Sequence, residues 1–483
     1  MSDEKSNEKK MNFNSDIVIG LEIHVELNTN TKLFCGCTRI VNEDELPNTR
    51  VCEICLGQPG CKPKLNKKAL EYSLKLALAL NCNVTNKLIF SRKSYFYPDM
   101  AKNYQISQFE EPLGLNGFIE LSDGEKINLT RIHIEEDPAS LVHPNGMHSS
   151  NYVLIDYNRS GNCLCEIVTN PEIKSANQAR EFMKNLISIL KYLKIYDPKT
   201  CIIKADANIS IKESNYVRAE VKNITGFKEI QKAIEYEIKR QKQDLKEGKQ
   251  LIQETRNWDS KLQITKRIRV KETEDDYGYI IDPDLVSINI TEEMIKKIKE
   301  NLPELATNKT KRYINDYKLN ETDSKVIAQT YELASIFEKV IKKVNPILAA
   351  KWLRRELVRV MNYNKIEFED LKINIQNLTD LLNLVENKKI TENVAQKILE
   401  ELVIKDFNVI EYVREKNLEL VNDSSLIEEY CVSAIKESKN AVDDYLSGNE
   451  KSLNFIVGIV MKKSKGRASP KEVKDLILKL IKK

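Results

Sequence analysis

The sequence predicts an α+β protein in which an N-terminal domain built on a sheet is followed by helical domains. Four segments before residue 225 alternate apolar and polar residues, which is the period-2 pattern of half-buried β-strands. From residue 291 to 483 the apolar residues recur at helical spacing instead, with short polar interruptions. We therefore expect an antiparallel sheet with flanking helices, then an all-helical domain and a small helical tail domain.

The expected domain boundaries follow these changes of pattern along the 483 residues, a length with room for roughly two to four domains. Residues 1–15 are polar and charged, so we expect a disordered N-terminal tip. Residues 16–290 form the expected sheet domain, which we call the cradle. Residues 291–405 form the expected helical domain, and residues 406–483 form the expected tail domain.

The charge balance and the cysteine content limit the class of protein. Lys and Arg number 76 and Asp and Glu 72, so a nucleic-acid surface would need local clusters of cations. No apolar run reaches the roughly 18 residues of a membrane-spanning helix, and the N-terminus lacks the apolar segment of a secretory signal. Ten cysteines are too few for a disulfide scaffold. We therefore expect a cytoplasmic protein.

The strand expected at residues 17–27 is the most informative segment. Its apolar residues share one face, whereas Glu22, His24 and Glu26 share the other. Neighbouring side chains on one face lie about 6.5–7 Å apart, so this row can hold a hard divalent cation with help from adjacent strands. The alternative is an edge strand whose polar face is simply solvated.

Three later segments repeat this alternation, at residues 130–136, 204–211 and 217–223. In the first of them Thr130 is expected to face inward with Ile132 and Ile134. The polar residues expected to face outward are Arg131, His133 and Glu135, then Asp206, Asn208 and Ser210, then Arg218, Glu220 and Lys222. Four such strands would build one sheet with a polar working face, which suits phosphate groups and metal.

Four cysteines have the spacing of a structural zinc site. Cys35 and Cys37 are followed, after fourteen intervening residues, by Cys52 and Cys55, with glycines nearby for tight turns. We expect one Zn²⁺ here. The alternative is reduced thiols packed as small apolar groups, and Cys61 is close enough to compete for a place in the ligand set.

The segments between these motifs are expected to be helices and loops. Helices are expected at residues 65–80, 175–195 and 228–247, the second with Ser175 and Gln178 as a capping box. Residues 91–108 are rich in aromatic side chains, amides and cations around Pro98, so we expect an irregular ligand-binding loop, the alternative being a solvated surface loop. Further loops over the same face are expected at residues 253–259 and 271–285.

The tail contains a cluster of cations near Gly466, formed by Lys462, Lys463, Lys465 and Arg467. Such a cluster fits phosphate contacts, and a solvated turn fits equally well. The sequence contains no Walker A loop, no dinucleotide-binding glycine motif and no Gly-x-Ser-x-Gly motif. Nucleophilic hydrolysis is therefore not the expected chemistry.

A series of longer motifs resembles one known family, the B subunits (GatB) of the tRNA-dependent aspartyl/glutamyl amidotransferases. Among them are Tyr-Phe-Tyr-Pro-Asp at residues 95–99 and Tyr-Gln-Ile-Ser-Gln at residues 104–108. The others lie at residues 18–27, 52–60, 135–137, 156–161, 206–208 and 253–256. The match runs in order from about residue 16 to residue 285 and resumes in the tail, without room for the inserted domain of a sister archaeal subunit.

The resemblance implies a ligase activity. Members of that family bind Asp-tRNA(Asn) or Glu-tRNA(Gln) and phosphorylate the side-chain carboxylate with ATP and Mg²⁺. Ammonia released from glutamine by a partner amidase (A) subunit then displaces the phosphate, in a heterotrimer with a small C subunit. A cation is needed because ATP and the substrate carboxylate repel one another. The sequence does not distinguish Asp-tRNA from Glu-tRNA as the substrate.

The resemblance also implies roles for particular residues. Glu22, His24, Glu135 and Glu220 match the catalytic magnesium-binding positions, and Cys35, Cys37, Cys52 and Cys55 match a zinc knuckle found in some members. Nucleotide or phosphate contacts are implied for Tyr95, Tyr97, Lys102, Tyr104, Arg159, Asp206 and Asn208. The chain departs from bacterial members at Gly278 and at Ile280 and Ile281, where they have a cation and aromatic residues, and Cys61 and Cys165 are unusual.

Two other classes of function are considered beside the ligase. A tRNA-binding scaffold without catalytic activity would not need a row of carboxylates facing phosphate groups, which would repel them unless a metal intervenes. A stand-alone metal hydrolase would need a water-activating site separate from the nucleotide loop, and the sequence shows none. Release of phosphate from ATP that depends on aminoacyl-tRNA separates the three.

Overall fold

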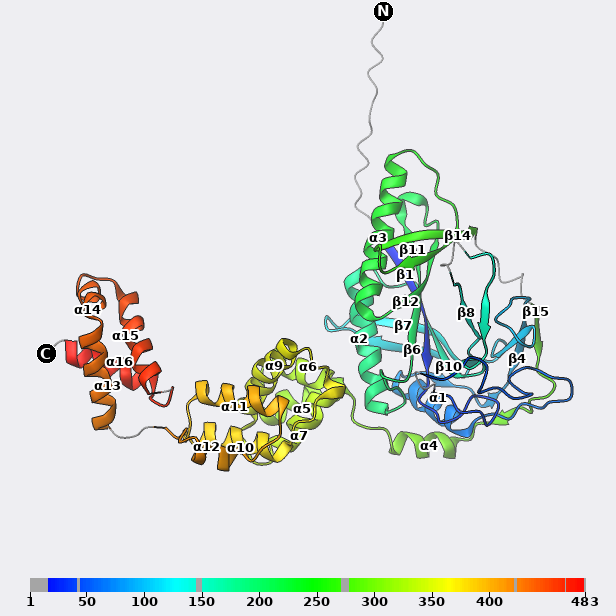
Figure 1. The fold of residues 1–483 in the computed structure, drawn as a ribbon. Helices are drawn as coiled ribbons and strands as arrows, with labels where there is room; N and C mark the ends of the chain where they lie inside the picture. Colours follow the sequence, from blue (N-terminus) through cyan, green and yellow to red (C-terminus); the bar gives the residue numbers. More distant parts are fainter. Residues whose placement is uncertain are drawn as a thin grey trace, which may run out of the picture. The chain divides into compact units, whose positions relative to one another are not determined.

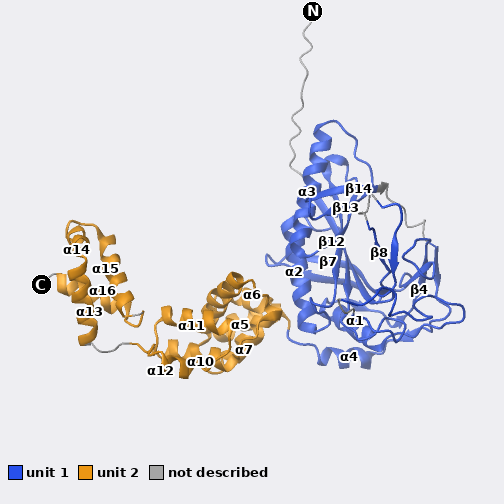
Figure 2. Cartoon of the chain, in the orientation of Figure 1, with its two compact units in different colours: residues 1–304 blue, residues 305–483 orange. Residues whose placement is uncertain are grey.

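The computed structural model describes residues 16–40, 44–144, 150–270, 278–420, 424–464 and 466–481. The expected tip at residues 1–15, the first half of the expected loop at 271–285 and Lys465 of the tail cluster lie outside this range. The chain forms two compact units, residues 1–304 and residues 305–483 (Figure 2).

The first unit is built on a nine-stranded sheet, counted over the described residues, with the order β14-β13-β12-β11-β1-β10-β7-β6-β2 (Figure 1). Its strands are β1 (Ile17–Glu26), β2 (Asn83–Val84), β6 (Gly114–Glu120), β7 (Lys126–Glu136), β10 (Cys163–Thr169), β11 (Ile203–Ile211), β12 (Ala219–Thr225), β13 (Glu254–Asp259) and β14 (Ile264–Val270). The four segments that alternate in the sequence all belong to this sheet, and β1 lies at its centre between β10 and β11. The α+β prediction is confirmed.

The apolar face of the sheet forms the core of this unit. Ile19, Leu21 and Ile23 of β1 are at most 1% exposed, and burying each such side chain contributes about 1.5–3 kcal/mol. Helices α1 (Lys67–Ala79), α2 (Ala176–Leu193) and α3 (Phe227–Lys246) pack against the strands, with α2 and α3 side by side (Figure 1). All three expected helices are present, and the Ser175 side chain caps α2 by accepting a hydrogen bond from the Gln178 N–H.

One pair of strands in the sheet is parallel rather than antiparallel. The segment from β12 through α3 to β13 is a strand, a crossover helix and a strand, and β12 pairs with β13 in parallel. A parallel pair requires such a crossover connection. The other pairings of the sheet are antiparallel.

Residues 253–259, 91–108 and 271–285 were expected to be loops, and each expectation is wrong in part, because strands occupy some of each range. The first range contains β13, whose polar side chains are matched by charged groups of α3, such as the ion pair of Arg256 with Glu237, so the strand lacks an apolar alternation. The second contains the hairpin of β4 (Ser91–Ser94) and β5 (Tyr104–Ser107), which joins β15 (Gly278–Ile281) in a three-stranded sheet. Four-residue polar strands are too short to show a period.

Two details of the expected strands also differ. Thr130 is exposed rather than inward-facing, because the pairing of β7 with β10 shifts register and leaves it out of the ladder. Val217 and Arg218 precede β12 instead of belonging to it, because the chain is still leaving a turn at Tyr216, whose φ is 57°. Two minor sheets pair β3 (Lys87–Leu88) with β16 (Ile288–Asn289) and β8 (Ser140–Val142) with β9 (Leu154–Asp156).

The first unit ends with α4 (Glu292–Glu300), and the described part of the second unit is helical. Its helices are α5 (Ala306–Tyr317), α6 (Glu321–Gln329), α7 (Tyr331–Val340), α8 (Pro346–Lys351), a wider-turn segment (Trp352–Leu357), α9 (Val358–Asn364), α10 (Ile375–Glu386), α11 (Glu392–Ile404), α12 (Val409–Glu415), α13 (Ser424–Glu437), α14 (Lys439–Leu446), α15 (Glu450–Lys463) and α16 (Pro470–Ile481). One apolar core runs from Tyr313 to Val413, and a second runs from Ile427 to Ile477. No helix among the described residues is both long and apolar enough to cross a membrane.

Candidate active site

A cluster of carboxylates and imidazoles lies on the polar face where β1, β10 and β7 run side by side. His24 of β1 is in register with Glu166 of β10, which is in register with His133 of β7. His24 Nε2 lies 3.6 Å from a Glu166 oxygen and 3.5 Å from a Glu135 oxygen. His24, Glu135 and Glu166 can each offer one ligand atom within 4.8 Å of the others, so this cluster could hold a metal ion.

The electrostatics of the cluster are those of a site with excess negative charge. Burial opposes the charged imidazole of His24, but the hydrogen bond and charge of Glu166, with Glu135, raise its pKa to about 10. Burial likewise opposes a charged His133, and the same two carboxylates raise its pKa to about 9. Burial and the charge of Glu135's neighbour Glu166 oppose the carboxylate form of Glu135, yet the imidazoles lower its pKa. The protonated imidazoles of His24 and His133 thus balance the carboxylate charge that a bound cation could balance instead.

The strand β5 holds the two carboxylates at the end of β7. Ser107 donates its hydroxyl to Glu135 over 3.1 Å, and the Ile106 N–H donates to Glu136 over 2.8 Å. Lys102 contributes its ammonium, 2.5 Å and 2.7 Å from the two oxygens of Glu136. The motif at residues 104–108 therefore positions the acidic end of β7.

In the other half of the polar face, on β11 and β12, the side chain of Lys222 balances the charge of the carboxylates. Lys222 Nζ lies 2.9 Å from an Asp206 oxygen and 3.0 Å from a Glu220 oxygen. Burial opposes its charge, but Asp206 and Glu220 raise the pKa of Lys222. Thr255 of β13 donates a hydrogen bond of 3.0 Å to Glu220. Asn208 joins the two halves, because it donates a 2.8 Å hydrogen bond to Glu22 of β1.

The four positions implied for magnesium are therefore distributed over the face. His24 and Glu135 come together with Glu166, and Glu22 lies two residues before His24 on the same side of β1. Glu220 is two strands away from β1, with β11 between them. Glu26, the third polar residue of β1, is used in a buried ion pair with Arg39 over 3.2 Å.

Positive groups flank the cluster on the side of Asp137. Arg159 Nε pairs with Asp137 over 3.0 Å, and Lys204 of β11 is in register with His24. Burial raises the pKa of Asp137 to about 6, against the opposing charges of Arg159 and Lys204. Burial and then the charge of Arg159 lower the pKa of Lys204. These two cations lie beside the candidate metal cluster, where an anionic group would find them.

The aromatic residues implied for nucleotide contact belong to the β4–β5 hairpin and its connection. The Arg92 guanidinium lies 4.5 Å from the centre of the Tyr104 ring, and the Lys102 ammonium lies 5.5 Å from it. Tyr95 is half-buried, and Tyr97 is 51% exposed. In the hairpin and its connection, Tyr95 and Tyr104 are therefore partly covered, whereas Tyr97 is open to solvent.

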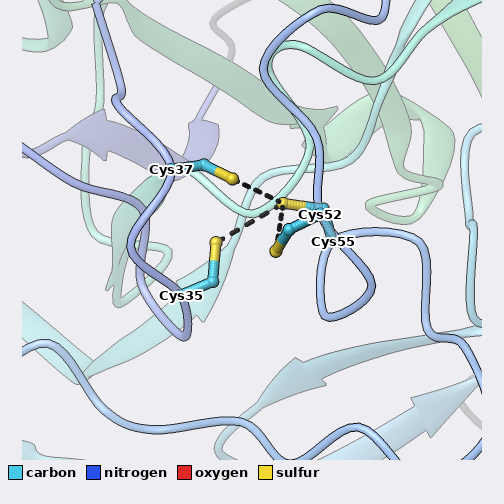
Figure 3. A group of neighbouring side chains, drawn as sticks. All are labelled: Cys35, Cys37, Cys52 and Cys55. Carbon is cyan, nitrogen blue, oxygen red and sulfur yellow. Dashed lines mark hydrogen bonds between the residues drawn. The ribbon is translucent and has the colours of Figure 1, made fainter.

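The four cysteines form one cluster in the first unit (Figure 3). Cys55 Sγ lies 3.4 Å, 3.7 Å and 3.8 Å from the sulfurs of Cys35, Cys52 and Cys37. A tetrahedral site with Zn–S bonds of about 2.3 Å separates its sulfurs by about 3.8 Å, so the thiols fit a metal, and Cys61 is not a member of this group.

A buried lysine, Lys32, lies beside this cluster. Its Nζ is 3.5 Å from Cys55 Sγ and also donates to the Arg50 and Tyr157 carbonyls over 2.9 Å and 3.2 Å. The hydrogen bond from Cys35 and the charge of Lys32 overcome burial and lower the pKa of Cys55 to about 4. The lysine thus supports a thiolate and joins the cluster to the loop that carries Arg159.

Three of these residues were missed by reasoning from the sequence, namely Glu166, Lys204 and Lys32. A signal for the first was present. Residues 163–169 read as a nearly continuous apolar run with Glu166 as its one charged residue, and an isolated carboxylate in a buried strand indicates a partner or a ligand. For the two lysines we find no signal of comparable strength.

Comparison with known proteins defines the class. Residues 17–296 match the GatB/GatE catalytic domain, and residues 335–481 match the GatB domain. A relative from Carboxydothermus hydrogenoformans, named as the B subunit of an aspartyl/glutamyl-tRNA(Asn/Gln) amidotransferase, is 42% identical over 96% of this chain and 98% of its own length. Proteins of the same name from Finegoldia magna and Thermotoga maritima are 39% and 40% identical over 96% of this chain, and over 99% and 98% of their own lengths.

The chain therefore belongs to the family of aspartyl/glutamyl-tRNA(Asn/Gln) amidotransferase B subunits. This confirms the resemblance inferred from the motifs. The first matched segment contains the whole polar face of the sheet and the four-cysteine cluster, whereas the second lies within the helical unit.

Proposed function

We propose that this chain is the tRNA-binding, carboxylate-activating subunit of a tRNA-dependent amidotransferase. It would convert Asp-tRNA(Asn), Glu-tRNA(Gln) or both into the amidated forms by phosphorylating the side-chain carboxylate with ATP and transferring ammonia to it. The observation that carries the proposal is the cluster of His24, Glu135 and Glu166 on the polar face of the domain that matches the family's catalytic domain. A tRNA-binding scaffold would have no use for this buried group of acids.

A divalent cation, Mg²⁺ in this proposal, would be held by His24, Glu135 and Glu166, with Glu22 next to them on β1. The carboxylates of Glu135 and Glu166 suit a hard cation that keeps part of its water shell, and His24 would add one nitrogen ligand. When bound, it would reduce the repulsion between ATP and the substrate carboxylate. Glu220 would act in the second half of the face, where Lys222 already balances its charge.

The residues around this cluster would bind the nucleotide. Arg159 and Lys204 are placed to attract phosphate oxygens. The implied contacts of Tyr95, Tyr97, Lys102, Tyr104, Asp206 and Asn208 remain proposals. Lys102 and Asp206 already have charged partners, so they would act by holding the site in shape as well as by touching the ligand.

The four cysteines would hold a structural Zn²⁺. The three sulfur-to-sulfur distances around Cys55 support this, as does the neighbouring ammonium of Lys32. Elemental analysis of the chelator-washed protein should find close to one equivalent, because thiolate sites hold zinc tightly. Less than about 0.2 equivalents would contradict the assignment.

The partners would be an amidase (A) subunit that releases ammonia from glutamine and a small C subunit, in a cytoplasmic heterotrimer. The tail would contact tRNA. The helices around the apolar core from Ile427 to Ile477 form a groove whose lining includes Lys436, Lys439, Lys462 and Lys463. Of these, Lys463 pairs with Glu437. The chain without a partner should make no amide from glutamine, and ammonium chloride should restore some product.

The function is tested in the assembled complex with Asp-tRNA(Asn) and Glu-tRNA(Gln). We expect phosphate release from ATP only with an aminoacyl-tRNA that is a substrate. Glu166→Gln should lower this release by at least about a hundredfold, the scale of losing a charge-stabilising group, while glutamine hydrolysis by the partner continues. Glu120→Gln, an exposed carboxylate on β6 of the same sheet, is the matched control. Phosphate release that is independent of tRNA, or unchanged by Glu166→Gln, would refute the proposal.

A further inference from the structure

A contact joins the four-cysteine cluster to the acidic end of β7. Gly57 lies two residues after Cys55, with a φ of 63°. A Cβ built on Gly57 would lie 2.2 Å from Lys102 Cγ and 3.1 Å from Lys102 Cβ, so the aliphatic part of Lys102 rests directly on the glycine backbone. A residue with a Cβ fits at position 57 only if Lys102 moves.

The position of Gly57 is set by the cysteine cluster. The N–H of Gly57 donates to the Ile54 carbonyl over 3.2 Å, and the N–H of Leu56 donates to the Cys52 carbonyl over 3.0 Å. These hydrogen bonds form the turn that carries Cys52 and Cys55. A metal that fixes the two sulfurs therefore fixes the glycine backbone as well.

On its other side Lys102 fixes Glu136. Its ammonium is 2.5 Å and 2.7 Å from the two carboxylate oxygens, and its side chain is 11% exposed. Glu136 also accepts the N–H of Ile106 over 2.8 Å. Because Glu136 follows Glu135 directly on β7, the way Glu136 is held determines how Glu135 is presented.

We propose that the four-cysteine cluster positions the active site: through Gly57 it fixes Lys102, and Lys102 holds Glu136 and thereby orients Glu135. This inference rests on the proposed function, in which Glu135 helps to hold the divalent cation. A cluster that only stabilised the fold would not require a side chain of the active site to lie on its turn. Gly57 and Lys102 are then positioning residues.

The test measures binding of Mn²⁺, used as a spectroscopic substitute for Mg²⁺, to the zinc-loaded full-length chain by electron paramagnetic resonance. Gly57→Ala should weaken Mn²⁺ binding about tenfold, the lower end of the loss found when groups behind a metal ligand are disturbed. Lys102→Ala should have a similar effect. Because both act through one chain of contacts, the double variant should again show about a tenfold loss, not a hundredfold loss.

Gly60 provides the matched control. Its φ of 84° is also positive, but a Cβ there would meet nothing within 4 Å. Gly60→Ala thus introduces comparable backbone strain three residues away without touching Lys102, and it should change Mn²⁺ affinity less than twofold.

The outcomes separate this inference from the proposed function. Glu135→Gln should weaken Mn²⁺ binding; if it does not, the proposed metal site is wrong and the inference falls with it. If Glu135→Gln weakens binding but Gly57→Ala does not, or if the double variant is additive, the inference alone is overturned. If the Gly57→Ala variant lost its zinc, and the double variant with Lys102→Ala lost it too, the substitution would have disturbed folding of the cysteine turn. That result would also overturn the inference.

Discussion

The two halves of the polar face share one sequence pattern and differ in how their charge is balanced. On β1, β10 and β7 the carboxylates Glu135 and Glu166 are paired with the imidazoles of His24 and His133, whose charge depends on protonation. On β11 and β12 the carboxylates Asp206 and Glu220 share the permanent ammonium of Lys222. A metal ion can replace a proton on the first half, whereas the second half already has its cation. Alternation alone therefore does not locate a metal site; the partner in the next strand does.

The largest expected effect comes from Glu22, which stands between the halves. Glu22→Gln keeps the shape of the side chain and its contact with Asn208 but removes one charge. We expect tRNA-dependent phosphate release to fall by at least about a hundredfold, with normal zinc content, normal melting and near-normal glutamine hydrolysis in the assembled complex. Unchanged phosphate release would remove Glu22 from the metal site and leave His24 as the one contribution of β1 to the cluster with Glu135 and Glu166.

The second half is tested by Lys222→Met, which removes the cation but keeps most of the side-chain volume. Asp206 and Glu220 would then repel one another, so we expect a loss of about 2 kcal/mol in the free energy of unfolding. Lys212→Met is the control, because the Lys212 pair with Asp16 is exposed and should cost less than about 0.5 kcal/mol. Equal losses measured by urea denaturation would show that the lysine is not the internal counter-charge.

Asn208→Ala tests the link between the halves and should have a smaller effect. It removes one part-buried hydrogen bond to Glu22, for which we expect a net contribution of about 1–1.5 kcal/mol, the upper part of the range for an ordinary hydrogen bond. We expect phosphate release to fall roughly fivefold to tenfold, and the loss should vanish when Glu22→Gln is already present. Independent, multiplicative losses would mean that Asn208 acts separately from Glu22.

Deleting the tail should have the smallest effect on the polar face, because the tail belongs to neither half of it. The first helical core includes Val409 and Val413, so the clean deletion is of residues 424–483 rather than from residue 406. We expect weaker tRNA binding and a smaller dependence of affinity on salt, because phosphate contacts are lost, with the cradle still folded. Unchanged tRNA affinity across several salt concentrations would contradict this.

The sequence revealed strands wherever one face was apolar and the other polar. β1 and β11 have that pattern, and their expected faces are those of the structure. It did not reveal β13, whose polar side chains are matched by α3, or the short strands of the hairpin. The order of strands was also hidden, because β10 enters the sheet between β1 and β7 and alternation carries no information about neighbours.

The candidate site was predictable to a similar extent. His24 and Glu135 were identified because each lies in a segment in which polar and apolar residues alternate, and the structure brings the two side chains together. Glu166 was missed because its strand reads as a buried segment. Lys222 was recognised as outward-facing, but its pairing with Asp206 depends on a register shift between β11 and β12 that no residue pattern displays. Chemistry that depends on register requires the fold.

The central place of β1 in the sheet has a consequence for synthesis of the protein. The strand is the first described element of the chain, yet its two neighbours are residues 163–169 and 203–211. At translation rates of about 5–20 residues per second, it waits roughly 10–40 s for the second of them. Both of its edges have no partner from the sheet until β10 is made, and one edge stays open until β11 follows. Nascent chains are thus exposed to misassembly at this strand until β11 has left the ribosome.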